Sequence, residues 1–127
     1  MNPLGIGIDV VDVARVARLL EQHGGRALER LLTNAERDYC LSMSVPARHI
    51  AARVAAKEAA FKAFHSAGAR GMIGWLEIEV ERYPHGEPTL TFHGRALAFA
   101  DELHVGRALV SLSHSDTQGA AVVLLLS

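Results

Sequence analysis

Residues 50–64 constrain the fold of this chain more than any other stretch. At about 100° per residue, their large apolar side chains fall within one stripe of a helix: Ile50, Val54, Phe61 and Phe64. The other side is almost entirely alanine, which favours helix and lets neighbouring backbone approach closely: Ala52, Ala56, Ala60 and Ala63. A helix that is apolar or small on nearly every side is usually buried. We therefore expect a long central helix on which the rest of the chain packs.

Three charged side chains on this helix need partners, because an unpaired buried charge is energetically costly. Lys57 falls on the apolar stripe, whereas Glu58 and Lys62 share a face at its edge, one helical turn apart. The chain has no other lysines. The simplest structural explanation is a Glu58–Lys62 pair within the helix and a Lys57 side chain that reaches solvent. A binding or catalytic role for these side chains is the alternative.

Length and composition limit the class of protein. A chain of 127 residues, of which 50% are hydrophobic, is expected to form one domain, residues 1–127, or a domain completed by oligomerisation. The net charge of −1 argues against binding nucleic acid or a membrane surface by bulk electrostatics. Cys40 is the single cysteine, which is typical of a reducing compartment. With no signal-peptide pattern and no apolar run of about 18 residues, we expect a soluble, cytoplasmic protein.

The segment Leu4–Val11 has the alternating pattern of a buried strand. Its large apolar residues share one face, and Gly5, Gly7 and Asp9 share the other, so bare backbone lies on the side of the carboxylate. An acid at the end of such a strand is a candidate site for a cation or a phosphate. A turn capped by Asp9 explains the pattern equally well. A phosphate-binding loop is excluded, because no Gly-Lys-Ser/Thr sequence follows.

Local signals predict the starts of the other helices in the first half of the chain. These signals are Asp12 as the cap of a helix over residues 13–22, the capping-box pair Thr33 and Glu36, and Pro46 in the first turn of the long helix.

Two antiparallel hairpins are expected in the second half. Residues 75–83 alternate between apolar side chains and glutamates, and a turn leads into a strand at 88–92. A short helix over 94–103 follows. Residues 108–113 and 120–126 form the second hairpin, whose last strand is apolar on both faces and is therefore central in a sheet or covered by another subunit. The expected fold class is α+β, with a long central helix packed on a small antiparallel sheet.

The seven histidines lack the His-x-x-x-His spacing of a zinc-binding helix. His114 ends a strand within Ser111–Ser115, where hydroxyl and imidazole groups suit a phosphate or a nucleotide edge. A purely structural histidine is the alternative at this position. No Gly-x-Ser-x-Gly elbow occurs, and Cys40 has no evident base, so nothing supports nucleophilic hydrolysis by serine or cysteine.

Three segments together resemble the 4′-phosphopantetheinyl transferases of the small holo-[acyl-carrier-protein] synthase type. Gly5–Val11 followed by Arg15 is similar to the family's opening G-I-D motif with its trailing arginine. Arg53–Ala63 is similar to the signature R-F-A-x-K-E-A-x-x-K-A, and Ser111–His114 is similar to the S-x-S-H strand. The segments follow the family's order along almost the whole chain, and the middle motif is the most specific.

The resemblance implies the family's fold and a Mg²⁺-dependent reaction. The 4′-phosphopantetheine group of coenzyme A would pass to a serine of apo acyl carrier protein, releasing adenosine 3′,5′-bisphosphate. Asp9 and Glu58 match the Mg²⁺ ligands, and Glu58 is the expected base, directly or through a metal-bound water. Lys62 is the implied catalytic charge at the phosphates. The residues implied in contacts with coenzyme A are Arg53, Lys57, Lys62, Gly86, Pro88 and His114.

The same resemblance implies two partners. One is the acyl carrier protein, of fatty-acid or polyketide type, which Arg15 and Arg18 would dock. The other is a further copy of this chain, in a trimer with sites between subunits. The Gly86-Glu87-Pro88 turn departs from the Gly-Lys-Pro of many relatives, and Asp116 is not assumed to have a role. The alternatives are an inactive coenzyme A- or nucleotide-binding oligomer of this fold, and an interaction module with accidental motif matches.

Overall fold

A computed structural model describes residues 1–127. Its elements are, in chain order, β1 (Pro3–Asp12), α1 (Val13–His23), α2 (Gly25–Leu31), α3 (Asn34–Leu41), α4 (Pro46–Ser66), the 3₁₀ helix η1 (Trp75–Glu77), β2 (Ile78–Arg82), β3 (Pro88–Phe92), α5 (Gly94–Glu102), β4 (Arg107–His114) and β5 (Gln118–Leu126). None of the helices combines the length and the apolar character needed to cross a membrane.

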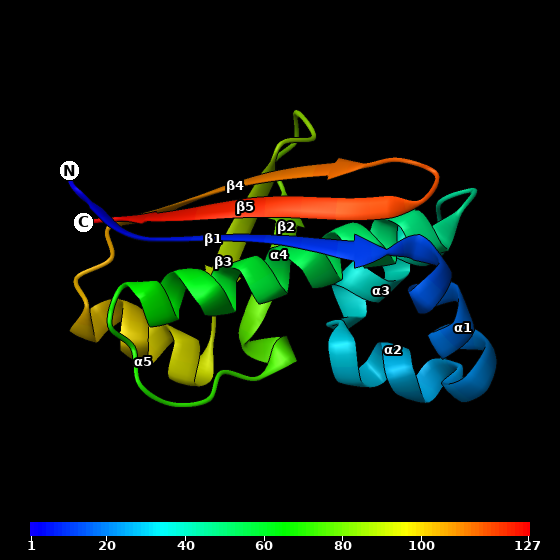
Figure 1. Ribbon diagram of the computed structural model, residues 1–127, viewed down its shortest axis with the longest axis horizontal. Helices are drawn as coiled ribbons and strands as arrows, with labels where there is room; N and C mark the ends of the chain where they lie inside the picture. The colour runs from blue at the N-terminus through cyan, green and yellow to red at the C-terminus, as the bar shows by residue number, and fades with distance from the viewer.

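The strands form two antiparallel sheets. β1, β5 and β4 make a three-stranded sheet with β5 in the centre, and β2 and β3 make a separate hairpin. Figure 1 shows α4 running along the three-stranded sheet, with α1 and α2 at one end of the molecule and α5 at the other. The predicted α+β fold and the long central helix are confirmed, and of the two alternatives for the last strand, the central position in a sheet is the one observed.

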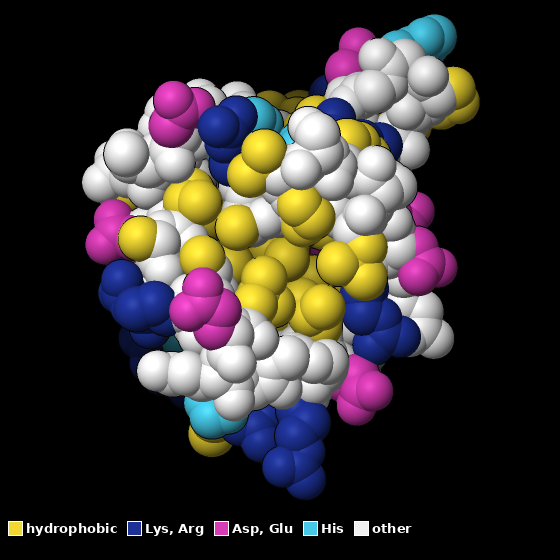
Figure 2. All heavy atoms as spheres, turned by 90° about the vertical axis from the view of Figure 1, so that its right-hand side faces the viewer, with side chains coloured by type: hydrophobic (Ala, Val, Ile, Leu, Met, Phe, Trp, Pro, Cys, Tyr) yellow, Lys and Arg dark blue, Asp and Glu magenta, His cyan; other side chains and the backbone are white.

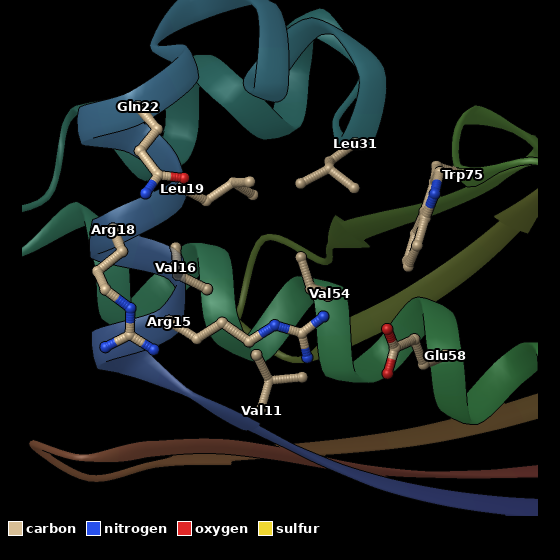
Figure 3. Close-up of a pocket in the computed structure, with 10 residues that line it drawn as sticks. All are labelled: Val11, Arg15, Val16, Arg18, Leu19, Gln22, Leu31, Val54, Glu58 and Trp75. Atoms are coloured by element: carbon tan, nitrogen blue, oxygen red, sulfur yellow. The ribbon is translucent and has the colours of Figure 1, made fainter.

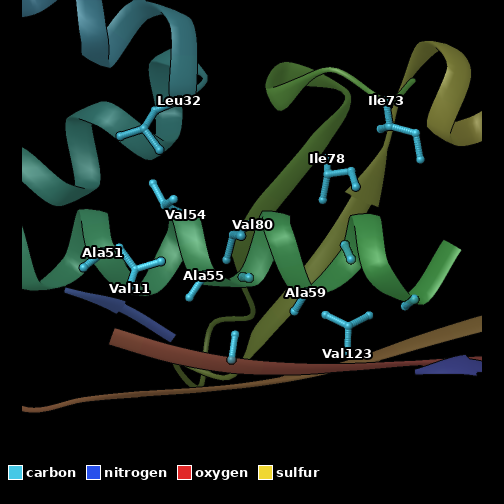
Figure 4. Packing of buried hydrophobic residues seen from close by; sticks show 14 of the residues in the cluster. Val11, Leu32, Ala51, Val54, Ala55, Ala59, Ile73, Ile78, Val80 and Val123 are labelled. Atoms are coloured by element: carbon cyan, nitrogen blue, oxygen red, sulfur yellow. The ribbon is translucent and has the colours of Figure 1, made fainter. Parts of the chain in front are cut away.

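The central helix is buried between the two sheets. Figure 4 shows Ala51, Ala55 and Ala59 of α4 among apolar side chains from both sheets. Val123 contributes from β5 and Ile78 from β2, and both are fully buried. Alanine on α4 allows the sheets to approach the helix closely, which explains why the expected alanine-rich side belongs to the core.

Two glycines of β1 make the closest approach to α4. A Cβ atom at Gly7 would clash with the carbonyl oxygen of Ala59, and one at Gly5 would clash with that of Ala63. The glycine side of β1 therefore faces the helix. The expectation of a strand buried on its apolar face is wrong for a single chain, because Ile6 is 61% exposed and Ile8 is 66% exposed.

Local predictions of element starts were partly correct. The Thr33 capping box is present, with Thr33 Oγ1 accepting from the Glu36 amide, and Pro46 opens α4. Asp12 precedes α1 but makes no side-chain cap. The strand expected from residue 75 begins only at Ile78, because the preceding residues form η1. Helix α2 was not predicted, since Gly24 and Gly25 suggest a break in the chain.

Replacing Gly7 by alanine should destabilise the protein by at least about 2 kcal/mol, because the new methyl group must push β1 away from α4. The matched control is Gly25→Ala at the start of α2, where no atom lies within 4 Å of the added Cβ. We expect this control to be neutral or slightly stabilising, since alanine favours helix. Urea unfolding of the two variants distinguishes them, and equal stability would contradict the close packing of β1 on α4.

Candidate active site

Asp9, Glu58 and Lys62 come together where β1 crosses α4. The Lys62 ammonium donates to Asp9 Oδ1 at 2.9 Å and to the backbone oxygen of Ile8 at 3.0 Å. Glu58 lies one turn before Lys62 on the same face of α4. The partner of Lys62 is thus Asp9 from β1, and not Glu58 as the simplest explanation within the helix required.

The pKa values of the two carboxyl groups in this cluster are shifted in opposite directions. Burial and the neighbouring Asp9 carboxylate raise the pKa of Glu58 to about 7, although Arg15 and Lys62 partly oppose the shift. Burial alone would raise the pKa of Asp9, but its interactions with Glu58 and Lys62 outweigh burial and lower it. A carboxyl group with a pKa near neutrality can exchange a proton at physiological pH.

The same cluster has the chemistry to hold a divalent cation. Asp9 Oδ2 is buried and has no hydrogen-bond partner, so one carboxylate oxygen lacks a ligand. Glu58 supplies a second carboxylate beside it. Mg²⁺ is commonly held by one or two carboxylates together with substrate oxygens and water. Asp9 and Glu58 therefore fit such an ion.

A pocket of about 300 Å³ opens beside Glu58. Its walls are mainly apolar and come from the end of β1, from α1, α2 and α4, and from Trp75 of η1. In Figure 3, Arg15 extends over α4 in the direction of Glu58, whereas the end of Arg18 points away from it. Trp75 packs against Phe61 at 5.2 Å between ring centroids. The pocket thus joins the carboxylate cluster to the exposed arginines of α1.

Lys57 is placed differently from the sequence-based expectation. Its ammonium is fully buried and donates to Glu36 Oε1 at 2.7 Å and to the backbone oxygen of Trp75 at 2.8 Å. The other carboxylate oxygen, Glu36 Oε2, accepts from the amide of Val80. The ammonium is 0% exposed and already paired, so the side chain does not reach solvent as the simplest structural explanation required. The expected coenzyme contact of Lys57 stays a prediction, and the contacts observed for its ammonium join α3, α4, η1 and β2.

Arg53 and Arg82 form a basic cluster around Tyr39, on the Lys57 side of α4. The Arg53 guanidinium lies 4.1 Å from the ring centre of Tyr39, and that of Arg82 lies 5.0 Å from the same ring. Arg53 is 2% exposed, and its Nε and Nη1 atoms have no hydrogen-bond partner. It lines a pocket of about 380 Å³ between α3, α4 and β2. Unpaired buried donors of this kind are suited to an anion.

His114, Gly86 and Pro88 lie on other elements. The His114 ring at the end of β4 is 4.9 Å from that of His49 on α4. Burial lowers the pKa of His49, and the nearby His114 and arginines lower it further. Gly86 lies in the turn between β2 and β3 with a φ of 90°, and Pro88 begins β3.

A single chain does not bring all the predicted residues into one cleft. Arg53 and Glu58 are five residues apart on α4, which turns them by roughly 140° from each other. The carboxylates and Lys62 therefore lie on one side of the helix, and the basic cluster lies on another. Sequence reasoning missed Tyr39, His49 and Arg82 in this cluster, because no local pattern reports contacts among α3, α4 and β2.

Removal of the Lys57 ammonium should leave a buried Glu36 carboxylate without its partner. We expect Lys57→Met to lower the free energy of unfolding by about 3–5 kcal/mol. The matched control is Lys62→Met, which removes an ammonium that is 57% exposed from an Asp9 carboxylate that is 13% exposed, and it should cost less than Lys57→Met. Urea unfolding measures both, and addition of Glu36→Gln to Lys57→Met should recover part of the loss. Equal effects of the two lysine variants would contradict the structural role of Lys57.

The raised pKa of Glu58 predicts how stability depends on pH in the metal-free protein. Because folding favours the protonated form, Glu58 lowers the free energy of unfolding as pH rises from about 4.5, its unperturbed value, to about 7. Glu58→Gln should therefore flatten the decrease in melting temperature between pH 5 and pH 8. Glu29→Gln, on the exposed side of α2, serves as the control. A Glu58→Gln curve that parallels the wild type would contradict the assigned shift.

Comparisons with known proteins identify the family of this chain. The family model of the 4′-phosphopantetheinyl transferase superfamily matches residues 5–122. The chain is similar to the holo-[acyl-carrier-protein] synthase of Koribacter versatilis, at 45% identity over 122 residues that cover 96% of this chain and 97% of that protein. It is also similar to that of Geobacter sulfurreducens, at 42% identity and 95% coverage of each chain.

Solved structures show the same fold. The Neisseria meningitidis holo-[acyl-carrier-protein] synthase superposes with a TM-score of 0.84 at 27% identity, over 98% of this chain and 99% of that one. The Helicobacter pylori enzyme in complex with coenzyme A superposes with a TM-score of 0.81 at 28% identity, over 95% of this chain and 99% of that one. The chain described here belongs to the 4′-phosphopantetheinyl transferase superfamily.

Proposed function

We propose that this protein is a holo-[acyl-carrier-protein] synthase. It transfers the 4′-phosphopantetheine group of coenzyme A to a serine of apo acyl carrier protein and releases adenosine 3′,5′-bisphosphate. The observation that carries the proposal is the joint placement of Asp9, Glu58 and Lys62 on a chain closely related to synthases of that name. The Helicobacter pylori relative was crystallised with coenzyme A, which supports the same substrate here.

Glu58 and Lys62 have different roles in the proposed reaction: Glu58 is the base, and Lys62 stabilises charge on the phosphates. Glu58, directly or through a metal-bound water, accepts the proton of the attacking serine hydroxyl. The serine oxygen forms a bond to the phosphorus next to pantetheine, and the bond from that phosphorus to the departing nucleotide breaks. Lys62 donates to the phosphate oxygens as charge develops on the leaving group. Mg²⁺ held by Asp9 and Glu58 would neutralise part of the charge on the pyrophosphate.

The nucleotide end of coenzyme A requires residues from the basic cluster. Arg53 and His114 are its predicted members, and Arg82 and His49 lie beside them. We assign Gly86 and Pro88 to backbone and apolar contacts near the same end. Because Arg53 is turned by roughly 140° from Glu58, we infer that one subunit supplies the carboxylates and a neighbour supplies this cluster.

An oligomer also accounts for the exposed face of the three-stranded sheet. Ile6, Ile8 and Val10 are more than half exposed on β1, at 61%, 66% and 53%. A contiguous apolar face of this kind is typical of a surface that another subunit covers. We propose a homotrimer with sites between its subunits. We place the protein in the cytoplasm, where the buried Cys40 thiol stays reduced.

The α1–α2 end of the molecule is the proposed docking face for the carrier protein. Figure 2 shows hydrophobic side chains in the middle of this face, with both Lys or Arg and Asp or Glu side chains around them. Arg15 and Arg18 are exposed and line the pocket that leads to Glu58. Positive charge at the edge of an apolar surface suits an acidic partner whose serine must reach the pocket.

The activity can be measured directly by mass spectrometry of apo acyl carrier protein incubated with this protein, coenzyme A and Mg²⁺. We expect the carrier to gain the mass of 4′-phosphopantetheine. Glu58→Gln should lower the rate by about 100-fold or more, because the variant lacks the base, while it still folds. Binding of coenzyme A without transfer to any carrier would instead support the inactive coenzyme-binding oligomer.

Charge reversal on α1 tests the docking face. Arg15→Glu combined with Arg18→Glu should raise the KM for carrier protein by about tenfold or more, with little change in the KM for coenzyme A. Added salt should weaken the wild-type interaction in the same way. The control is Arg70→Glu with Arg107→Glu, which changes net charge equally at exposed positions away from α1. Loss of coenzyme affinity with unchanged carrier affinity would place the α1 arginines at the nucleotide.

A further inference from the structure

The Lys62 ammonium forms an ion pair with Asp9, a carboxylate that the divalent cation would also bind. Lys62 Nζ is 2.9 Å from Asp9 Oδ1, and the remaining oxygen, Asp9 Oδ2, is buried without a partner. No other positively charged side chain is within ion-pair distance of Asp9. In the metal-free protein, Lys62 is thus the counterion of this carboxylate.

An ammonium at Asp9 Oδ1 and a divalent cation at Asp9 Oδ2 repel each other, so each is expected to weaken the binding of the other. Mg²⁺ binds carboxylate oxygens at about 2.0–2.1 Å, which would place it next to the ammonium already at Asp9. Mg²⁺ also requires nearly regular octahedral coordination, so its remaining positions must be free for water and phosphate oxygens. The Lys62 ammonium lies beside that space for as long as it is bound to Asp9.

The Lys62 side chain is free to move, unlike that of Lys57. It is 57% exposed, whereas Asp9 is only 13% exposed and is fixed on β1. Its remaining contact is the backbone oxygen of Ile8. By contrast, Lys57 is 0% exposed and is held by Glu36 and Trp75. Release of Lys62 therefore disturbs no packed side chain.

We propose that Lys62 and the divalent cation are alternative occupants of Asp9, and that metal binding releases the Lys62 ammonium toward the phosphates of coenzyme A. The inference rests on the proposed function, since it takes the metal site and the phosphate position from it. It assigns Lys62 a second role, in which the lysine lowers metal affinity before the substrate arrives. The same side chain becomes available for phosphate only when the metal is in place.

The first test is metal binding without coenzyme A, measured by Mn²⁺ titration with electron paramagnetic resonance. Lys62→Met should bind Mn²⁺ about tenfold more tightly than the wild type, the factor expected if the ion pair is formed about nine-tenths of the time. Arg15→Met is the matched control, because Arg15 influences Glu58 by its charge but makes no ion pair in the cluster. We expect less than a threefold change for this control.

The second test uses the fact that the chain contains only two lysines. Protein labelled with isotopic lysine should give one side-chain NMR signal for Lys57 and one for Lys62. Addition of Mg²⁺ should move the Lys62 signal to the position of a solvated lysine, while the Lys57 signal changes much less. This measurement is made on the wild-type protein, so it does not depend on the folding of a variant.

The outcomes separate this inference from the proposed function. Equal Mn²⁺ affinity of wild type and Lys62→Met overturns the exclusion and leaves the metal site intact. An equal gain in affinity for Arg15→Met and Lys62→Met also overturns it, because long-range charge then explains the effect. A Lys62 NMR signal that stays in place at saturating Mg²⁺ overturns it as well. Failure of Mn²⁺ to bind any of the proteins, with or without coenzyme A, overturns both the inference and the metal-dependent function.

Discussion

The packing of β1 on α4 is the constraint on which the rest of the structure depends. Gly5 and Gly7 leave no room for side chains between this strand and the helix. The close approach brings Asp9 within hydrogen-bond distance of Lys62, although the two residues are 53 positions apart in the chain. It also turns the apolar side of β1 outward, where Ile6 and Ile8 remain exposed. The close contact between the backbones of β1 and α4 thus places Asp9 beside Lys62, and it also leaves the apolar face of β1 exposed for contact with another subunit.

Helix α4 separates its charges by their position around the axis. Arg53 and Lys57 are four residues apart and lie on one side, among α3, η1 and β2. Glu58 and Lys62 have the same spacing on a side that meets β1 and the pocket. Lys57 is buried and joins neighbouring elements, Arg53 lines a separate pocket, and Glu58 and Lys62 are accessible to ligands. The charged residues between Arg53 and Lys62 are close in sequence, but they lie on different sides of the helix and make different contacts.

The sequence was sufficient to predict the elements whose signals are local. The alternating strands, the Thr33 capping box and the alanine-rich helix all depend on neighbouring residues, and the structure has them. It could not predict the partner of Lys57, because Glu36 lies on α3 and its capping-box pattern already explains its presence. Nor could it show which side of β1 is covered, since glycines in a strand can mark weak packing as well as close approach. The resemblance to the transferase family implied site roles for Lys57, Glu58 and Lys62 alike, and it could not show that Lys57 is paired with Glu36 in the interior.

The division of labour between the two lysines can be measured by reductive methylation of the folded protein, followed by peptide mass spectrometry. Lys62 is exposed and should be methylated readily, and coenzyme A with Mg²⁺ should slow that reaction because the ammonium then contacts phosphate. Lys57 is buried in its pair with Glu36 and should be modified only after unfolding. Methylation of Lys57 at the rate of Lys62, or protection of Lys57 by coenzyme A, would contradict the separation of structural and functional charge on α4.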